Sequence, residues 1–599
     1  MKRLLVGGVA LALVVAACTE SADDDAVPPE TLTTTSSAAP QTTAVPQTTA
    51  APPTTTITRA PSAPGHGGPV IIADDRFPPT LNPFAPGGDS FIVSSIGQAW
   101  LTGVWDIDGS TLERIPEVVT ALPTVANGGI VVNPNRTMTI IYNIREEAVW
   151  SDGVPITADD FAFTVETSLA LEAETEHQST YTAVQIRSFE GEGKTFSVTL
   201  RRPTMEHEAL FRWLIPKHAV EGTAITEDWN TTAWPSGGPF VLDTFDQGQS
   251  VRLVRNETYW KTDPDTGMQL PYLDSVEFRF LPETERIIAA FKARRVDVIQ
   301  PPPGIDMFIE PLKQLEQDGA IVEVIPGLMW EHVNFQFSDS RLELSPNSCN
   351  DNVAFRRAIM HAIDRDVAAG SWAPGYGLAM QSYIDAFTPS ISTDAWGRYP
   401  YDSDAARTLY ETAVEETGRE CAAIFSTTGN SDERSRLALL YEEMMAEAGI
   451  PFGVRFEESS VFFGEMFDDG TWDIGQWAWF GSHGLSGLIG THDLFDPNGL
   501  PPKGSNYYQW GTRGSSVRDE YTKRFAEIVK EMNSTVDEGE IVALVHEAEE
   551  ILADQAVILP IVQHITAAAV WADEIGGFKH NPTEASYTWN IEQWYRTDR

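Results

Sequence analysis

The stretch from Glu420 to Phe456 alternates between strand and helix patterns, and this alternation constrains the fold more than any other feature of the sequence. "ECAAIFSTT" is a short apolar run of the kind that forms a buried strand. Ser431 or Asp432 can then cap a helix that ends at Gly449, and "PFGVRF" returns as a second strand. The apolar side of this helix consists of Leu437, Leu440, Tyr441 and Met444. Strand, helix and strand in this order predict a βαβ unit and therefore a layered α/β fold.

A second helix and strand follow near the C-terminus. The apolar stripe of this helix consists of Ile541, Leu544, Val545, Ala548, Ile551 and Leu552, and the strand is "AVILPIVQ". About 530 residues remain after position 67, which is too many for a single hydrophobic core. No repeat of 20 to 50 residues is apparent. We therefore expect more than one α/β domain.

The stretch "AVWSDGVPITADDFAFTVE", Ala148 to Glu166, gathers polar side chains beside a tryptophan. They are Ser151, Asp152, Thr157, Asp159 and Asp160. The preceding "MTIIYNI" alternates as a strand does, and Gly153 suits a tight turn. Thr157 can accept a hydrogen bond from the third helical amide, and Asp160 lies at the positive end of the helix dipole. We interpret these residues as turn and cap, not as an active site.

The N-terminus has the pattern of an exported protein. Lys2 and Arg3 precede the apolar run 4–17, which is typical of a signal peptide and too short to span a bilayer comfortably. "VAAC" resembles a bacterial lipobox, so we expect cleavage after residue 17 and lipid attachment at Cys18; the alternative is an ordinary signal with a chance cysteine. Segment 18–67 is rich in Thr, Pro, Ala and Ser without apolar periodicity, which predicts a disordered tether.

Composition limits the partners and the redox chemistry. The formal net charge is −45, which argues against nucleic acid as a partner and against docking of the body on anionic lipid. In an exported protein Cys349 and Cys421 are candidates for a disulfide, which would close a loop of about 70 residues. Two separate buried thiols are the alternative. Two cysteines at this spacing do not make a zinc site.

We find no motif that predicts catalysis or a cofactor. Gly-x-Ser-x-Gly, His-Glu-x-x-His and P-loop patterns are absent from the sequence. The segment from Asp263 to Gly267 is better explained as a turn than as a calcium loop. Five histidines lack the paired spacing of metal ligands: His207, His218, His332, His361 and His564. We therefore expect neither an enzyme nor a metalloprotein.

Four blocks of the sequence resemble, in the same order, those of family 5 extracellular solute-binding proteins, the oligopeptide, dipeptide and nickel receptors of ABC importers. They are "VWSDGVPITADDFAFT", "YWKTDPDTGMQLPYLDSVEFRF" (Tyr259 to Phe280), "ARRVDVIQ" and "NDNVAFRRAIMHAIDRDVAAG" (Asn350 to Gly370). Arg294 stands where glycine is usual in the third block. The resemblance extends from about residue 68 to the C-terminus.

This resemblance implies a two-lobed α/β fold of the type II periplasmic-binding-protein kind. Lobe I would comprise residues 68–328 and 566–599, with an extra subdomain at about 110–235 that contains the Trp-Ser-Asp-Gly corner. Lobe II would comprise 338–557. Two strands would cross between the lobes, at about 329–337 and 558–565. The implied partners are a small solute and the membrane permease, and we expect a monomer held at the cell surface or in the periplasm by its lipid.

The resemblance also suggests where a solute would bind. In peptide-binding relatives an aspartate three residues after a tryptophan pairs with the α-ammonium group of the peptide. Here Asp473 and Trp479 align with that pattern, but Ser482 stands in place of the anchoring aspartate. Since an unpaired buried ammonium is costly, we expect a solute without a free amine there, such as a sugar or a modified peptide. An oligopeptide bound through another acid is the alternative.

Aromatic residues cluster in "WDIGQWAWFGSHG" and "SNYYQWG", which suits a cleft for bulky solutes. The candidate ligand-binding residues are Trp479, Ser482, Trp477, His483, Trp330, Tyr376, Asn506 and Trp510. For any one of these aromatic residues, packing in the core is the competing explanation. The rival functions are a sensor or adhesin on the same fold that does not transport, and an enzyme on the same scaffold.

Overall fold

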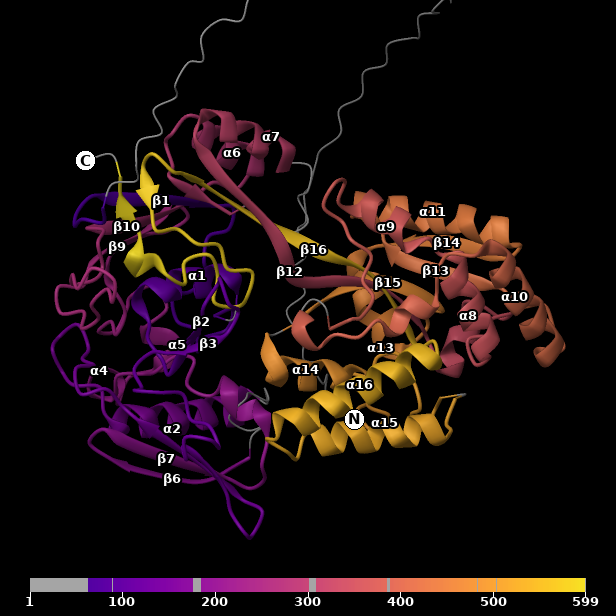
Figure 1. The fold of residues 1–599 in the computed structure, drawn as a ribbon, viewed down its shortest axis with the longest axis horizontal. Coiled ribbons are helices and arrows are strands. Elements are labelled where there is room, and N and C mark those ends of the chain that lie inside the picture. Colours follow the sequence, from indigo (N-terminus) through magenta and orange to yellow (C-terminus); the bar gives the residue numbers. More distant parts are fainter. Residues whose placement is uncertain are drawn as a thin grey trace, which may run out of the picture.

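The computed structural model describes residues 63–88, 90–175, 185–300, 309–384, 388–481, 483–501, 504–515 and 517–597. The predicted signal peptide, lipidation site Cys18 and most of the tether lie outside these residues, as does Ser482. Figure 1 shows two lobes, one indigo to magenta and one mainly orange, joined by a pair of long strands. The two-lobed α/β architecture expected from the sequence is confirmed.

One mixed sheet of ten strands extends through both lobes. Its strands run, in spatial order, β14 (Phe452–Glu457), β13 (Ala423–Thr428), β15 (Ile474–Phe480), β12 (Ala320–Phe335), β16 (Ile558–Trp571), β11 (Val298–Ile299), β1 (Pro69–Asp74), β10 (Ser275–Phe280), β9 (Ser250–Arg255) and β8 (Phe240–Asp246). The long antiparallel pair β12 and β16 lies at the centre and belongs to both lobes (Figure 1).

The two central strands change neighbours along their length. The N-terminal half of β12 pairs with the C-terminal half of β16, which in turn pairs with β11 of lobe I. The C-terminal half of β12 pairs with β15 of lobe II. The register between β12 and β16 shifts between Pro326 and Trp330, and again between Glu331 and His332. Two segments, 329–337 and 558–565, were predicted to cross between the lobes. They lie mainly in the lobe II halves of β12 and β16. Strand β12 begins, and strand β16 ends, further into lobe I.

Lobe II contains the βαβ unit that was predicted for residues 420–456. Strands β13 and β14 are parallel, and helix α11 (Asp432–Ala448) connects them. The Ser431 side chain accepts a hydrogen bond from the backbone N–H of Arg434, and Gly449 ends the helix at a φ of 74°. The other helices of this lobe are α8 (Val353–Ala362), α9 (Arg365–Trp372), α10 (Ser403–Thr417), α12 (Ser459–Val461), α13 (Phe467–Asp469), α14 (Gly484–His492), α15 (Glu520–Met532) and α16 (Glu538–Asp554).

A second sheet lies within the range that was predicted as an extra subdomain of lobe I. Its order is β4 (Ile130–Val132), β5 (Met138–Asn143), β7 (Thr195–Leu200) and β6 (Ile186–Glu192), and helix α2 (Ala158–Thr175) packs beside it. Ser151 and Ser236 are joined by two hydrogen bonds, and Asp160 accepts one at 2.9 Å from the backbone N–H of Thr157. The polar residues at 151–160 therefore shape a corner and a helix start, as predicted, but the Asp160 backbone N–H donates to the Thr157 backbone carbonyl and not to the Thr157 side chain as expected.

The remaining elements of lobe I surround its half of the main sheet. They are α1 (Phe91–Trp100), β2 (Trp105–Ile107), β3 (Arg114–Pro116), the 3₁₀ helix η1 (Met205–Ala209), α4 (Lys217–Val220), α5 (Ile225–Asp228), α6 (Thr284–Lys292), α7 (Ile309–Lys313), β17 (Ile575–Gly576) and β18 (Tyr595–Arg596). The segment after β16 returns to this lobe, as its yellow ribbon shows (Figure 1). Its Tyr587, Ile591 and Trp594 are buried in the same core as Val70 and Phe278.

Cys349 and Cys421 are joined in the structure, with an S–S distance of 2.03 Å. The bridge connects the loop before α8 to the start of β13, inside lobe II. Among the described residues, no helix has both the length and the apolar character that crossing a membrane requires.

Candidate functional site

The edge of lobe II that faces lobe I is formed by the carboxyl ends of β13 and β15. In open α/β sheets this is the edge at which ligands bind. The chain that leaves β15 at Phe480 comes directly against lobe I: the His483 imidazole hydrogen-bonds the backbone carbonyl of Leu112, and its backbone N–H lies 3.4 Å from the Glu584 carboxylate. Arg114 of lobe I donates to the Ser486 hydroxyl at 3.1 Å. The lobes therefore touch beside the end of β15.

Trp479 is the predicted aromatic that remains partly open to solvent at this edge. Its ring lies 6.2 Å from that of Tyr507 and 6.4 Å from that of Phe467, centroid to centroid. Phe480 follows on the opposite face of the strand and is 57% exposed. Large aromatic rings with exposed surface beside the contact between the lobes can support a bulky or extended solute.

Four other candidates are fully buried. Trp330, Trp477, Trp510 and Asn506 are each at most 1% exposed. The Asn506 amide donates to the backbone carbonyls of Asp496 and Trp510 at 2.9 and 3.0 Å, which fixes the loop before α15. Their geometry fits packing and loop closure. Tyr376 is half-buried against the lobe II core, and His483 joins the two lobes as described above.

A buried charged cluster, not anticipated from the sequence, lies where β12 crosses between the lobes. Glu331 is fully buried and accepts hydrogen bonds from Arg434 at 2.7 Å, His564 at 3.1 Å and Gln476 at 3.1 Å. Although burial alone would raise its pKa, the charge of Arg434 and the hydrogen bond from His564 hold the pKa of Glu331 well below its ordinary value. The sequence contained one signal for this cluster, the acidic residue Glu331 within a strand predicted to cross between the lobes.

Two acids near the end of β15 differ in their availability: Asp473 is buried and hydrogen-bonded, and Glu584 of lobe I is half-buried. Asp473 is fully buried, and its carboxylate accepts from the Asn350 side chain and the Ile424 backbone N–H, both at 2.9 Å. Burial raises its pKa to about 6. Glu584 is the half-buried carboxylate next to His483. Among the described residues it forms no ion pair within 4 Å with a Lys, Arg or His side chain.

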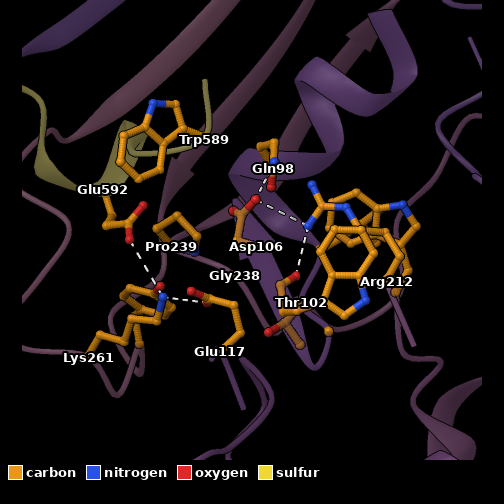
Figure 2. A pocket seen from close by; sticks show the side chains of 15 residues that line it. Gln98, Thr102, Asp106, Glu117, Arg212, Gly238, Pro239, Lys261, Trp589 and Glu592 are labelled. Carbon is orange, nitrogen blue, oxygen red and sulfur yellow. Dashed lines mark hydrogen bonds and ion pairs between the residues drawn. The ribbon is translucent and has the colours of Figure 1, made fainter. Parts of the chain in front are cut away.

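A polar cavity in lobe I is a separate feature. Figure 2 shows Lys261 between Glu117 and Glu592, and Asp106 between Gln98 and Arg212. Burial raises the pKa of Asp106 to about 7. The free space for the centre of a water molecule is only about 20 Å³, enough for a single water. The ion pair of Glu592 with Lys261 and the packing of Trp589 hold the C-terminal segment against lobe I. The cavity between them has no room for a solute.

The described residues contain no group of three or more His, Cys, Asp or Glu side chains that could hold a metal ion. Asp263 instead organises a turn: its carboxylate accepts from the backbone N–H of Asp265 at 2.7 Å and from the Tyr272 hydroxyl at 2.5 Å. This agrees with the interpretation of that segment as a turn.

Comparison with known proteins places this geometry in a family. The chain is 24% identical to the oligopeptide-binding protein OppA of Bacillus subtilis (strain 168), over 71% of this chain and 76% of the relative. It is 24% identical to OppA of Mycobacterium bovis, over 84% and 81%. Its fold is similar to those of the periplasmic EDTA-binding protein EppA (TM-score 0.72, 22% identity, 90% of this chain and 98% of that one) and of AppA from Bacillus subtilis in complex with a nonapeptide (TM-score 0.60, 18% identity, 89% and 100%).

The family of bacterial extracellular solute-binding proteins, family 5, matches residues 131–487, which include the subdomain, the crossing strand β12 and the edge that carries Trp479. This match covers more than half of the chain and extends through both lobes. The chain belongs to the family 5 extracellular solute-binding proteins.

Proposed function

We propose that this protein binds a peptide or another polar solute in the cleft between its lobes, against Trp479, and delivers it to a membrane permease. It is the extracytoplasmic solute-binding component of an ABC importer. The observation that carries the location of the site is the partly exposed Trp479 at the carboxyl edge of lobe II, beside the point where His483 touches lobe I. Binding needs no chemical step: a solute that contacts both lobes favours their closed arrangement.

We propose further that the solute presents no free ammonium group to lobe II. A bound ammonium requires a carboxylate or several hydrogen-bond acceptors, since leaving it unpaired costs several kcal/mol. Glu331 is already neutralised by Arg434, and Asp473 is buried against Asn350. Neither carboxylate is available to a solute. This supports a neutral polar solute, such as a sugar or an N-blocked peptide.

Glu584 favours one alternative, a peptide with a free amine. Its carboxylate belongs to lobe I and lies next to His483, the neighbour of position 482. A lobe I acid at this place could pair with an ammonium group when the lobes close. The names of the curated relatives, which are oligopeptide-binding proteins, also favour this alternative.

Isothermal titration calorimetry can decide between these solutes. Free peptides, the same peptides N-acetylated, and a set of oligosaccharides would be titrated into the protein. We expect binding that survives N-acetylation or needs no peptide. Micromolar binding of free peptides that disappears on N-acetylation, and that Glu584→Gln weakens, would instead establish the ammonium site.

A pair of tryptophan variants tests the location. Trp479→Ala should weaken binding at least tenfold, while Trp229→Ala, which removes a partly exposed tryptophan of lobe I, should leave it unchanged. Wild-type affinity in Trp479→Ala would show that the solute binds elsewhere.

We propose that the protein is held at the membrane by lipid on Cys18 and acts as a monomer. The lipobox-like "VAAC" after an apolar run supports the anchor, because two or more acyl chains hold a protein stably at a bilayer. Cys18→Ser should release the protein from membranes or leave an unprocessed precursor. A processed variant that stays membrane-bound would contradict this. Light scattering would measure the oligomeric state.

We also propose that residues 68–328 with 566–599 move as lobe I and 338–557 as lobe II. The hinge would lie at about 329–337 and 558–565. The register shifts of β12 at Pro326–Trp330 and Glu331–His332 indicate bends in the strand close to these segments, which supports a hinge there.

A further inference from the structure

A chain of hydrogen bonds runs from Trp479 into the core of lobe II. The Trp479 indole N–H donates to the Tyr508 hydroxyl oxygen at 2.6 Å. That hydroxyl lies 3.1 Å from Nε2 of His332, on the crossing strand β12. The chain therefore links the partly exposed ring near the carboxyl end of β15 to a residue beside a register shift of the crossing strand.

The chemistry of the three groups limits the directions of the protons. An indole N–H can only donate, so the Tyr508 oxygen accepts from Trp479 with one lone pair. Between Tyr508 and His332 the proton has two arrangements: Nε2 accepts the hydroxyl proton when the imidazole proton is on Nδ1, and it donates to the second lone pair of the hydroxyl oxygen when the proton is on Nε2. Burial lowers the pKa of His332 to about 3, so the neutral ring of both arrangements is the form present at neutral pH.

The middle member of the chain is held rigidly. Tyr508 is 1% exposed and its ring stacks on Trp477 at 5.8 Å and on Phe495 at 5.1 Å. His332 is fully buried, with its ring 4.6 Å from that of Trp330. This explains why Trp330 and Trp477, predicted to contact solute, are buried: they pack around the groups that hold Trp479.

We propose that Tyr508 and His332 are positioning residues that fix the orientation of the Trp479 indole for solute binding. This inference rests on the proposed function, because it assumes that Trp479 contacts the solute. A free indole at a strand end can adopt several rotamers, and ordering it on binding would cost affinity. A hydrogen bond to a buried, stacked tyrosine selects one orientation before the solute arrives.

Fluorine NMR of protein labelled with 5-fluorotryptophan tests the orientation directly. Trp479→Phe assigns the resonance of residue 479. Tyr508→Phe removes one oxygen and keeps the stacked ring, so the Trp479 resonance should shift and broaden. Tyr441→Phe is the matched control, because the Tyr441 hydroxyl is also buried in lobe II but has no hydrogen-bond partner among the described residues. A Trp479 resonance unchanged in Tyr508→Phe would overturn the inference.

A titration on the same samples tests the effect on binding. The probe is a mixture of free pentapeptides, N-acetylated pentapeptides and oligosaccharides. It should perturb the Trp479 resonance of the parent protein, and in Tyr508→Phe the apparent affinity should fall by up to about tenfold, as expected for the loss of one hydrogen bond. Equal affinity in the parent and Tyr508→Phe would overturn the positioning role. No response of the parent resonance would refute the site proposed at Trp479, and with it this inference.

Two His332 variants separate positioning from packing. In His332→Gln the amide oxygen can still accept the Tyr508 proton, whereas His332→Leu offers no acceptor. We expect the Trp479 resonance and the affinity of His332→Gln to lie closer to the parent values. If both variants fold, as judged by circular dichroism, and behave alike, the role of His332 is packing alone.

Discussion

At the scale of single residues, Glu331 depends on its partner Arg434. The carboxylate is fully buried and Arg434 supplies its positive charge at 2.7 Å. Arg434→Met would leave a buried charge unpaired, so we expect a loss of about 3–5 kcal/mol in the free energy of unfolding. Arg436→Met, on the exposed side of the same helix, should cost less than about 0.5 kcal/mol. Urea unfolding measures both, and equal losses would show that the pair does not matter for stability.

His492 gives the protein a pH-dependent stability. It is buried between the Leu488 carbonyl, at 2.6 Å, and the Tyr383 hydroxyl, at 2.5 Å, and burial lowers its pKa from 6.5 to about 4. The unfolded chain therefore takes up this proton at higher pH than the folded protein. The stabilisation is complete above pH 6.5 and is lost as the pH falls towards 4, by about 3 kcal/mol in all.

Unfolding experiments between pH 4 and 7 should therefore show a flatter dependence for His492→Gln than for the parent. Buried acids such as Asp473, with a pKa raised to about 6, act in the opposite direction, so the comparison between the two proteins is the informative quantity. An unchanged slope in His492→Gln would contradict the prediction.

The role of a single residue could be predicted from the sequence where local backbone chemistry determines it, and could not where tertiary packing does. Ser431 and Gly449 were readable as helix ends because caps depend on local backbone chemistry. Trp479 and Trp477 were not distinguishable, since they lie on the same face of one strand and differ only in what tertiary packing covers them. The Glu331–Arg434 pair joins residues about 100 positions apart, so no local pattern could reveal it.

At the scale of elements, the Cys349–Cys421 bridge ties the start of α8 to β13. The two residues are 72 positions apart, and closing such a loop in the unfolded chain is worth about 4 kcal/mol in the chain-entropy model. We expect Cys349→Ser/Cys421→Ser to lose stability by about this amount in urea unfolding. Reductant should destabilise the parent protein and leave the double variant unaffected. Two alkylatable thiols in the untreated parent would refute the bridge.

Element boundaries were predicted well where end signals are local and poorly where they are not. Helix α11 lies within one residue of its predicted ends, and β5 within one residue of "MTIIYNI". Strand β12 begins at Ala320, nine residues before the predicted crossing segment, because its N-terminal half is defined by pairing with β16 and not by its own apolar pattern. Strand pairing between distant segments is a tertiary property.

At the scale of the whole molecule, the net charge of −45 opposes compactness. Added salt screens repulsion between like charges over a Debye length of about 10 Å at 0.1 M. We expect the melting temperature to rise by about 3 °C or more between 20 mM and 500 mM NaCl at pH 7. The rise should vanish near the isoelectric point, where the net charge is small. A melting temperature that falls with salt would mean that ion pairs such as Arg524–Glu547 outweigh the repulsion.

The pairing of β12 with β16 also determines the order in which the two lobes can finish folding. Every element between β12 and β16 belongs to lobe II and comes from one uninterrupted stretch, whereas lobe I needs the last segment of the chain to finish its core. A polypeptide that emerges N-terminus first therefore exposes an unfinished lobe I until residues 558–597 arrive. Lobe II, though second in the sequence, has its core residues once Ala567 arrives, so it can be completed before lobe I. During export the unpaired edges of β11 and β12 must be kept from other chains, and the final yellow segment of Figure 1 closes them.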